Sequence, residues 1–74
     1  MELRDLRTFL VCARLQHFTQ AAEELAYAQS TVTAQIRSLE KELDVPLFDR
    51  VGRGVVLTPA GQRLEGYARR VVDL

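Results

Sequence analysis

One predicted helix, within residues 29–43, carries short and cationic side chains along a single side. Successive residues of an α-helix are rotated by about 100°, so four residues share that side: Ser30, Ala34, Arg37 and Lys41. The first two offer a hydroxyl and a methyl group, and the last two are cations. Short polar groups can contact base edges while cations contact phosphates. This side is typical of a helix that enters the major groove of DNA.

The opposite side of the same helix is apolar. Its residues recur at the spacing of one helical face, and they are Val32, Ile36, Leu39 and Leu43. The helix is expected to begin near Gln29 and to end at Leu43, because Pro46 forces Val45 out of helical geometry. Gln29, Thr31 and Thr33 add hydrogen-bonding groups to its first half. Any one of these polar groups could instead only cap or solvate the helix start.

Two shorter segments must hold this helix in place. A first helix is predicted from Leu3 to about Leu15. It is apolar on several sides and should therefore pack against several elements, with Cys12 as a small packing residue rather than a reactive thiol. A second helix should end at Leu25, with Thr19 as its N-cap and Phe18 as a hydrophobic staple.

The second helix and the helix that follows form a helix-turn-helix pattern. A tight turn at Ala26-Tyr27-Ala28 joins them. His17, beside the predicted cap, is interpreted as a surface or capping residue rather than a pH switch.

A short hairpin follows the helix-turn-helix. Two strand-like runs, 47–50 and 55–57, flank the glycine-containing turn 51–54. The hairpin would hold Arg53 at its tip and Arg50 at its base, where arginine can reach phosphates or a narrow minor groove. An ordinary surface arginine on a hairpin is the alternative. The elements predict a mainly α winged helix-turn-helix with three helices and a short two-stranded wing, followed by a long C-terminal helix.

The last helix is predicted to begin after Thr58-Pro59, a capping hydroxyl followed by proline at the first helical position. Its apolar residues follow a heptad-like 4-3-4-3 spacing, typical of a dimerisation seam, and they are Ala60, Leu64, Tyr67, Val71 and Leu74. We expect a DNA-binding domain at 1–57 and a linker and dimerisation helix at 58–74. The apolar pattern continues to Leu74, so the helix is expected to continue in a longer protein.

Composition limits the functions that remain. The chain has 74 residues, ten Lys and Arg against ten Asp and Glu, one Cys and one His. Without a Cys/His cluster, a nucleophile with a paired base or a phosphate-binding glycine loop, we expect no enzyme, cofactor or metal. The polar N-terminus and the lack of a long apolar run predict a cytoplasmic protein without a membrane partner. Zero net charge keeps open a winged-helix module that binds protein instead of DNA.

In their order and spacing, these elements resemble the N-terminal domain of LysR-type transcriptional regulators over nearly the whole chain. The matching motifs are Leu6 and Phe9, Phe18-Thr19-Gln20-Ala21-Ala22, Gln29-Ser30-Thr31-Val32-Thr33, Ile36 with Leu39-Glu40 and Leu43, Pro46-Leu47-Phe48-Asp49-Arg50, and Leu57-Thr58-Pro59-Ala60-Gly61.

The resemblance implies a bacterial transcription factor that binds double-stranded DNA, at an inverted-repeat site, as a homodimer formed through the last helix. In full length it implies a tetramer and a C-terminal domain that binds a small-molecule effector. Its DNA contacts map onto Gln29, Ser30, Thr31, Thr33, Ala34 and Arg37 in the helix, and onto Arg50 and Arg53 in the wing. Many relatives have a hydroxyl residue at Ala28 and arginine at Ala34, so only a methyl contact, for instance with thymine, is expected at Ala34.

Overall fold

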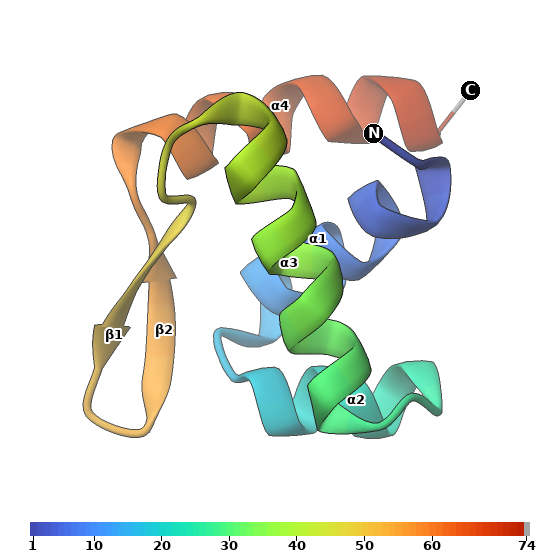
Figure 1. Cartoon of the computed structure of the whole chain (residues 1–74), viewed down its shortest axis with the longest axis vertical. Helices are drawn as coiled ribbons and strands as arrows, with labels where there is room; N and C mark the ends of the chain where they lie inside the picture. The colour runs from blue at the N-terminus through green and yellow to red at the C-terminus, as the bar shows by residue number, and fades with distance from the viewer. Residues whose placement is uncertain (74) are drawn as a thin grey trace.

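Four helices and one β-hairpin follow one another in the predicted order. The computed structural model, shown in Figure 1, describes residues 1–73. Its elements are α1 (Leu3–Leu15), α2 (Phe18–Leu25), α3 (Gln29–Leu43), β1 (Phe48–Val51), β2 (Gly54–Leu57) and α4 (Pro59–Val72). This is the predicted mainly α winged helix-turn-helix with a further helix at its C-terminal end. Among these residues, no helix is long and apolar enough to cross a membrane.

Helix α1 lies at the centre of the core and contacts all three other helices, as its apolar residues on several sides predicted. Phe9 and Cys12 have no exposed surface, and Val32, Ile36 and Leu39 from the apolar side of α3 are buried with them. Leu43, the fourth residue of that side, is 38% exposed. The core therefore ends one turn before α3 does.

The start of α2 differs from the prediction. The N-cap is His17, whose Nδ1 accepts a hydrogen bond from the Gln20 backbone N–H at 3.2 Å, and Thr19 lies inside the helix. A histidine nitrogen supplies the acceptor that a threonine hydroxyl was expected to supply. Phe18, the first residue of α2, packs edge-on against Phe48 of β1, with ring centroids 5.3 Å apart.

Three contacts fix the hairpin to the helices. Phe48 also packs against Phe9 of α1, at 5.4 Å between ring centroids. The Val55 backbone N–H donates a 3.0 Å hydrogen bond to the carbonyl oxygen of Gln16, in the turn between α1 and α2. A Cβ at Gly54 would lie 2.7 Å from that oxygen, so glycine is what permits the close approach. The hairpin is therefore attached at its turn end as well as at its base.

The first turn of α4 is bound to the segment that joins α3 to the hairpin. The Thr58 hydroxyl accepts from the Gly61 N–H at 3.0 Å, which confirms the predicted cap, and donates to the Pro46 carbonyl at 2.7 Å. The Thr58 N–H donates to the Leu47 carbonyl at 3.0 Å. A Cβ at Gly61 would overlap that same carbonyl oxygen. The start of α4 therefore packs directly against backbone.

Helix α4 uses two different sides. Leu64 and Ala68 are buried in the common core with α1 and half-buried Val71 packs against that core, whereas Tyr67 is 52% exposed. The heptad-like spacing placed Leu64 and Tyr67 on one seam. In the structure Leu64 is buried and Tyr67 is exposed. The same spacing can place a side chain in the core of its own chain or against a partner helix.

Candidate nucleic-acid interface

The side of α3 that faces away from the core is open to solvent. Ser30, Ala34, Arg37 and Lys41 are all exposed, and so is Gln29. Thr33 is half-buried and lines, together with Gln29, Ser30, Ala34 and Arg37, an open hollow of about 710 Å³ along this side. The structure thus brings most of the residues predicted for base contact onto one continuous surface.

Acidic neighbours of this surface are engaged elsewhere. Glu40 accepts a 2.8 Å hydrogen bond from the Leu47 backbone N–H through Oε2. Glu42 forms a 2.7 Å ion pair with the amino group of Met1, which raises the pKa of that amine mainly through this hydrogen bond. Both carboxylates are thus oriented toward partners other than Arg37 and Lys41, and neither forms an ion pair with these two cations.

The wing extends the basic surface beside α3. Arg50 and Arg53 are both exposed, and Arg53 lies in the two-residue turn between the strands. Arg50 pairs with Val55, one residue pair from the turn. It therefore lies nearer the tip than the predicted base, because Val51 and Gly54 extend the strands beyond the runs seen in the sequence.

A hollow between α3 and the wing connects their cations. Arg37 of α3 and Arg50 of the wing both line it, together with Thr33, the carboxylate of Glu40, and apolar residues that include Phe18 and Phe48. The packing that holds the wing to α1 and α2 thus also sets how far Arg50 stands from Arg37. Lys41 and Arg53 line neither this hollow nor the open hollow along the outward side of α3.

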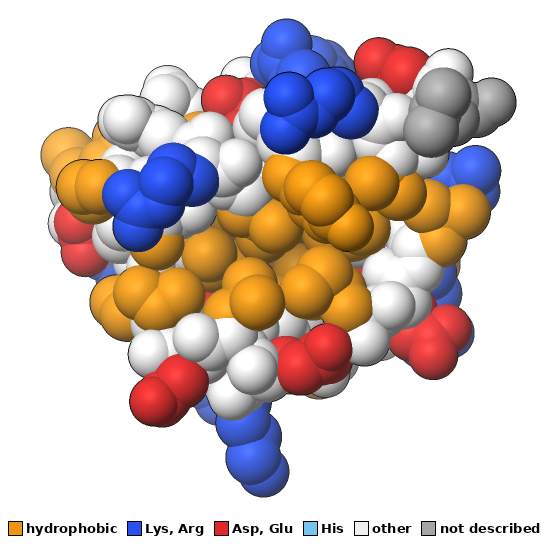
Figure 2. Space-filling model, turned by 90° about the horizontal axis from the view of Figure 1, so that it is seen from above, with side chains coloured by type: hydrophobic (Ala, Val, Ile, Leu, Met, Phe, Trp, Pro, Cys, Tyr) orange, Lys and Arg blue, Asp and Glu red, His pale blue; other side chains and the backbone are white. Residues whose placement is uncertain are grey.

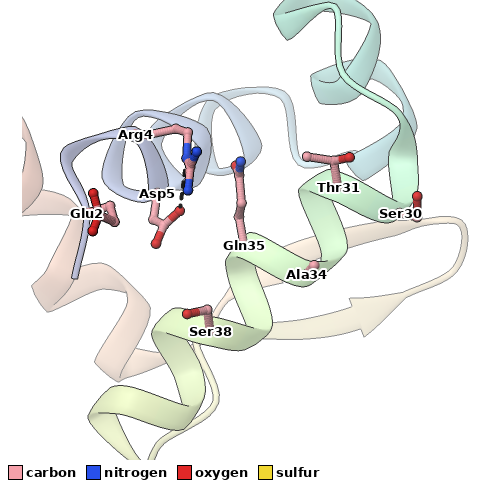
Figure 3. A pocket seen from close by; sticks show the side chains of 8 residues that line it. All are labelled: Glu2, Arg4, Asp5, Ser30, Thr31, Ala34, Gln35 and Ser38. Carbon is pink, nitrogen blue, oxygen red and sulfur yellow. Dashed lines mark ion pairs between the residues drawn. The ribbon is translucent and has the colours of Figure 1, made fainter.

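A third hollow, on the other flank of α3, was not foreseen from the sequence. Figure 3 shows Glu2, Arg4 and Asp5 from the start of α1 facing Thr31, Gln35 and Ser38 of α3. Asp5 is 5% exposed and forms an ion pair with Arg4 at 3.8 Å. This contact could not be predicted from local patterns, since it depends on how α1 crosses α3.

Two hydrogen bonds connect glutamines of α3 to threonines of other helices. Thr8 of α1 donates to Oε1 of buried Gln35 at 2.5 Å, and Thr19 of α2 donates to Oε1 of exposed Gln29 at 3.1 Å. Sequence reasoning missed both, because 27 residues separate the first pair and 10 separate the second. Each bond fixes which end of the amide faces its neighbour.

An apolar surface covers the α4 side of the molecule. Figure 2 shows hydrophobic side chains gathered across the middle of this side, with charged side chains of both signs around them. Tyr67 and Val71 of α4 are the predicted dimerisation residues with solvent-accessible side chains, while Leu64 is 9% exposed. Leu74, the fourth predicted residue, lies outside the described residues.

The remaining reactive groups do not form a site. Burial raises the pKa of the Cys12 thiol from its ordinary value of 9.0 to about 12, in keeping with a packing residue. Within residues 1–73, no group of three or more His, Cys, Asp or Glu side chains could hold a metal ion.

Comparison with known proteins gives consistent matches over this chain. Residues 3–62 match the family described as bacterial regulatory helix-turn-helix protein, lysR family. The chain is 47% identical over all 74 residues to the uncharacterized HTH-type transcriptional regulator YwqM of Bacillus subtilis (strain 168). It is 45% identical over 71 residues, 96% of the chain, to the RuBisCO operon transcriptional regulator of Allochromatium vinosum. These matches cover 25% and 24% of the two relatives, so the chain spans about a quarter of their length.

Solved structures match the whole fold. The CbnR_DBD-DNA complex superimposes with a TM-score of 0.94 at 37% identity, covering 99% of this chain and 84% of that one. The BenM_DBD/benA site 1 DNA complex gives 0.93 at 41% identity, covering 99% and 85%. Full-length CbnR complexed with its target DNA gives 0.95 at 38% identity, covering all of this chain and 26% of that one.

Proposed function

Because the chain belongs to the LysR family of bacterial helix-turn-helix regulators, we propose that it binds double-stranded DNA as the DNA-binding domain of a transcriptional regulator. Helix α3 enters the major groove, and the wing contacts the backbone or the minor groove alongside. Structural neighbours at 37% and 41% identity are complexes with DNA. They support the proposal over a winged-helix module that binds only protein.

One observation carries this proposal. The outward side of α3 is exposed from Gln29 to Lys41, bears cations and no unpartnered acid, and lies beside the arginines of the wing. This local basic surface explains how a chain with zero net charge can bind a polyanion. Few phosphate contacts per copy also imply modest non-specific affinity, so a second copy has to contribute.

The residues divide into two roles. Base contacts are assigned to the first half of α3, from residues with short or hydrogen-bonding side chains: Gln29, Ser30, Thr31, Thr33 and Ala34. Phosphate or minor-groove contacts are assigned to Arg37, Lys41, Arg50 and Arg53. The hollow shared by Arg37 and Arg50 favours binding of a single backbone segment between α3 and the wing.

The second copy is proposed to join through α4. Tyr67 is its most exposed apolar residue and half-buried Val71 adjoins it, while Leu64, beside them on the helix, is buried within the chain. In this scheme residues 1–57 contact DNA, and residues 58–74 form the start of the dimerisation helix. Two-fold symmetry then predicts an inverted-repeat site. In the full-length regulator we infer a tetramer and a separate effector-binding domain, in keeping with relatives about four times as long.

Selection of bound duplexes from a random pool tests the function directly. The expected result is enrichment of an inverted repeat whose half-sites lie about one helical turn apart. A titration against random duplex at low salt accompanies the selection and should give weak, salt-dependent binding. Failure to bind any duplex at low salt would overturn the DNA-binding assignment and favour the protein-interaction module.

A further inference from the structure

Gln29 occupies a special place on the proposed interface. It is the first residue of α3, its side chain is exposed, and it lines the open hollow along the outward side. The Thr19 hydroxyl donates to its Oε1 at 3.1 Å and takes one of the two lone pairs of that oxygen. Within residues 1–73, its amide nitrogen donates to no protein acceptor. The free end of this amide is therefore the NH₂ group.

We propose that Thr19 is a positioning residue that fixes the Gln29 amide so that its NH₂ group, and not its oxygen, faces the DNA. This inference rests on the proposed function and adds a preference to it. A glutamine free to rotate pairs with adenine, because its nitrogen donates to N7 and its oxygen accepts from the N6 amino group. With one lone pair of Oε1 taken by Thr19, the oxygen is a weaker acceptor for adenine N6 while the polarised NH₂ group is a stronger donor, so the double pairing with adenine is disfavoured relative to contacts made by NH₂ alone.

The ligand that this fixed amide suits best is thus a group that accepts hydrogen bonds from NH₂. Two parts of DNA have this chemistry: the guanine edge, where N7 and O6 both accept, and the phosphate oxygens. Against a base, the fixed amide favours guanine over adenine at one position of each half-site. Against a phosphate, it adds affinity that does not depend on sequence.

The chain offers a clean set of variants. Thr19 is exposed and does not cap α2, which uses His17 for that purpose. Thr19→Val removes the hydroxyl at nearly constant shape and helix propensity, so the variant should fold. Thr19→Ser keeps the hydroxyl and is the matched control. Gln29→Glu keeps the acceptor for Thr19 but removes the NH₂ donor.

The first measurement needs no DNA. NMR of the Gln29 side-chain amide in the free chain should show restricted motion in the wild type and in Thr19→Ser, and faster motion in Thr19→Val. Equal mobility in all three would overturn the proposal. This result stands whether or not the chain binds DNA, so its failure is distinguishable from failure of the proposed function.

The second measurement repeats the duplex selection and the affinity titration with each variant. If the partner is guanine, Thr19→Val should reduce the preference for guanine over adenine at one position per half-site by about fivefold or more. If the partner is a phosphate, Thr19→Val should weaken binding to all DNA sequences by the same factor. In both cases Thr19→Ser behaves as wild type and Gln29→Glu binds more weakly. A wild type that binds DNA with a Thr19→Val variant unchanged in affinity and preference would overturn the proposal.

Discussion

The four cations of the proposed interface differ in their surroundings. Arg37 and Arg50 line a common hollow between α3 and the wing, whereas Arg53 is an exposed residue of the wing turn. A guanidinium at a thin, exposed tip can follow the DNA backbone but cannot be held against one base. Arg53 should therefore contribute affinity rather than sequence preference.

Replacing Arg53 with alanine tests this distinction. Binding should weaken by a similar factor for all duplexes, and the slope of log affinity against log salt should become shallower by about one. The measurement is a salt series on one selected and one random duplex. The control is Arg69→Ala, which removes a charge from the far end of α4, at the opposite end of the molecule from the wing turn in Figure 1. Unchanged affinity and salt slope in Arg53→Ala would show that the wing does not touch DNA.

Cys12 gives a prediction for pH. Its pKa in the folded chain is about 12 against an ordinary 9.0, so the unfolded chain loses this proton first. The contribution of the buried neutral thiol to the free energy of unfolding is fully present below pH 9. It is lost as the pH rises from 9 toward 12, by up to about 1.4 kcal/mol per pH unit. Urea unfolding should therefore show that raising the pH from 8 to 11 lowers the free energy of unfolding of the wild type more than that of Cys12→Ala. The same pH dependence in both proteins would contradict burial of the thiol.

At the level of elements, the hairpin depends on a turn distant in sequence. Because a Cβ at Gly54 would meet the Gln16 carbonyl at 2.7 Å, Gly54→Ala must move the wing or lose the hydrogen bond from the Val55 N–H. DNA affinity should fall several-fold while the helical circular dichroism stays the same. Gly52→Ala is the comparison, since a Cβ at Gly52 would have no neighbouring atom within 4 Å. Its strain would come only from the positive φ of 59° at that residue. Equal DNA affinities for the two variants would argue against a fixed wing.

The glycines of α4 predict opposite effects. Gly66 is exposed, inside the helix, and no atom lies within 4 Å of a Cβ there, so Gly66→Ala should stabilise the fold by about 1 kcal/mol. Gly61 packs against the Leu47 carbonyl, so Gly61→Ala should destabilise it strongly. Thermal unfolding of both variants checks this pair. A destabilised Gly66→Ala would mean that its side of α4 is covered.

The elements were more predictable from the sequence than the contacts between them. Periodicity placed α3 correctly, because the apolar side and Pro46 are local signals. It could not show that His17 rather than Thr19 caps α2, since both can supply an acceptor. The seam through Leu64 was ambiguous for a similar reason, because one spacing describes both a core-facing and a partner-facing strip. The Thr19–Gln29 bond needed the crossing of two helices and had no signal in the sequence.

For the whole molecule, the buried and the exposed apolar residues of α4 have different proposed roles, in folding and in dimerisation. Tyr67→Asp places a charge at an exposed position of α4, so it should leave the fold intact and abolish the dimer. Sedimentation should show a monomer, and the affinity gained by a second half-site on DNA should be lost. Leu64→Ala, by contrast, should cost about 2–5 kcal/mol of folding stability. A dimer that survives Tyr67→Asp would place the interface elsewhere.

The attachment of α4 to backbone has a mechanical consequence. Pro46 and Leu47 receive three direct contacts from the start of this helix, through the hydroxyl and N–H of Thr58 and through Gly61. No flexible joint separates the proposed dimerisation helix from the end of α3 or from the strand that enters the wing. Each copy should therefore move as one rigid body that includes α3, the wing and α4. The spacing between two recognition helices can then change only when one α4 slides or rotates on the other, and a signal from elsewhere in a longer regulator would have to act there.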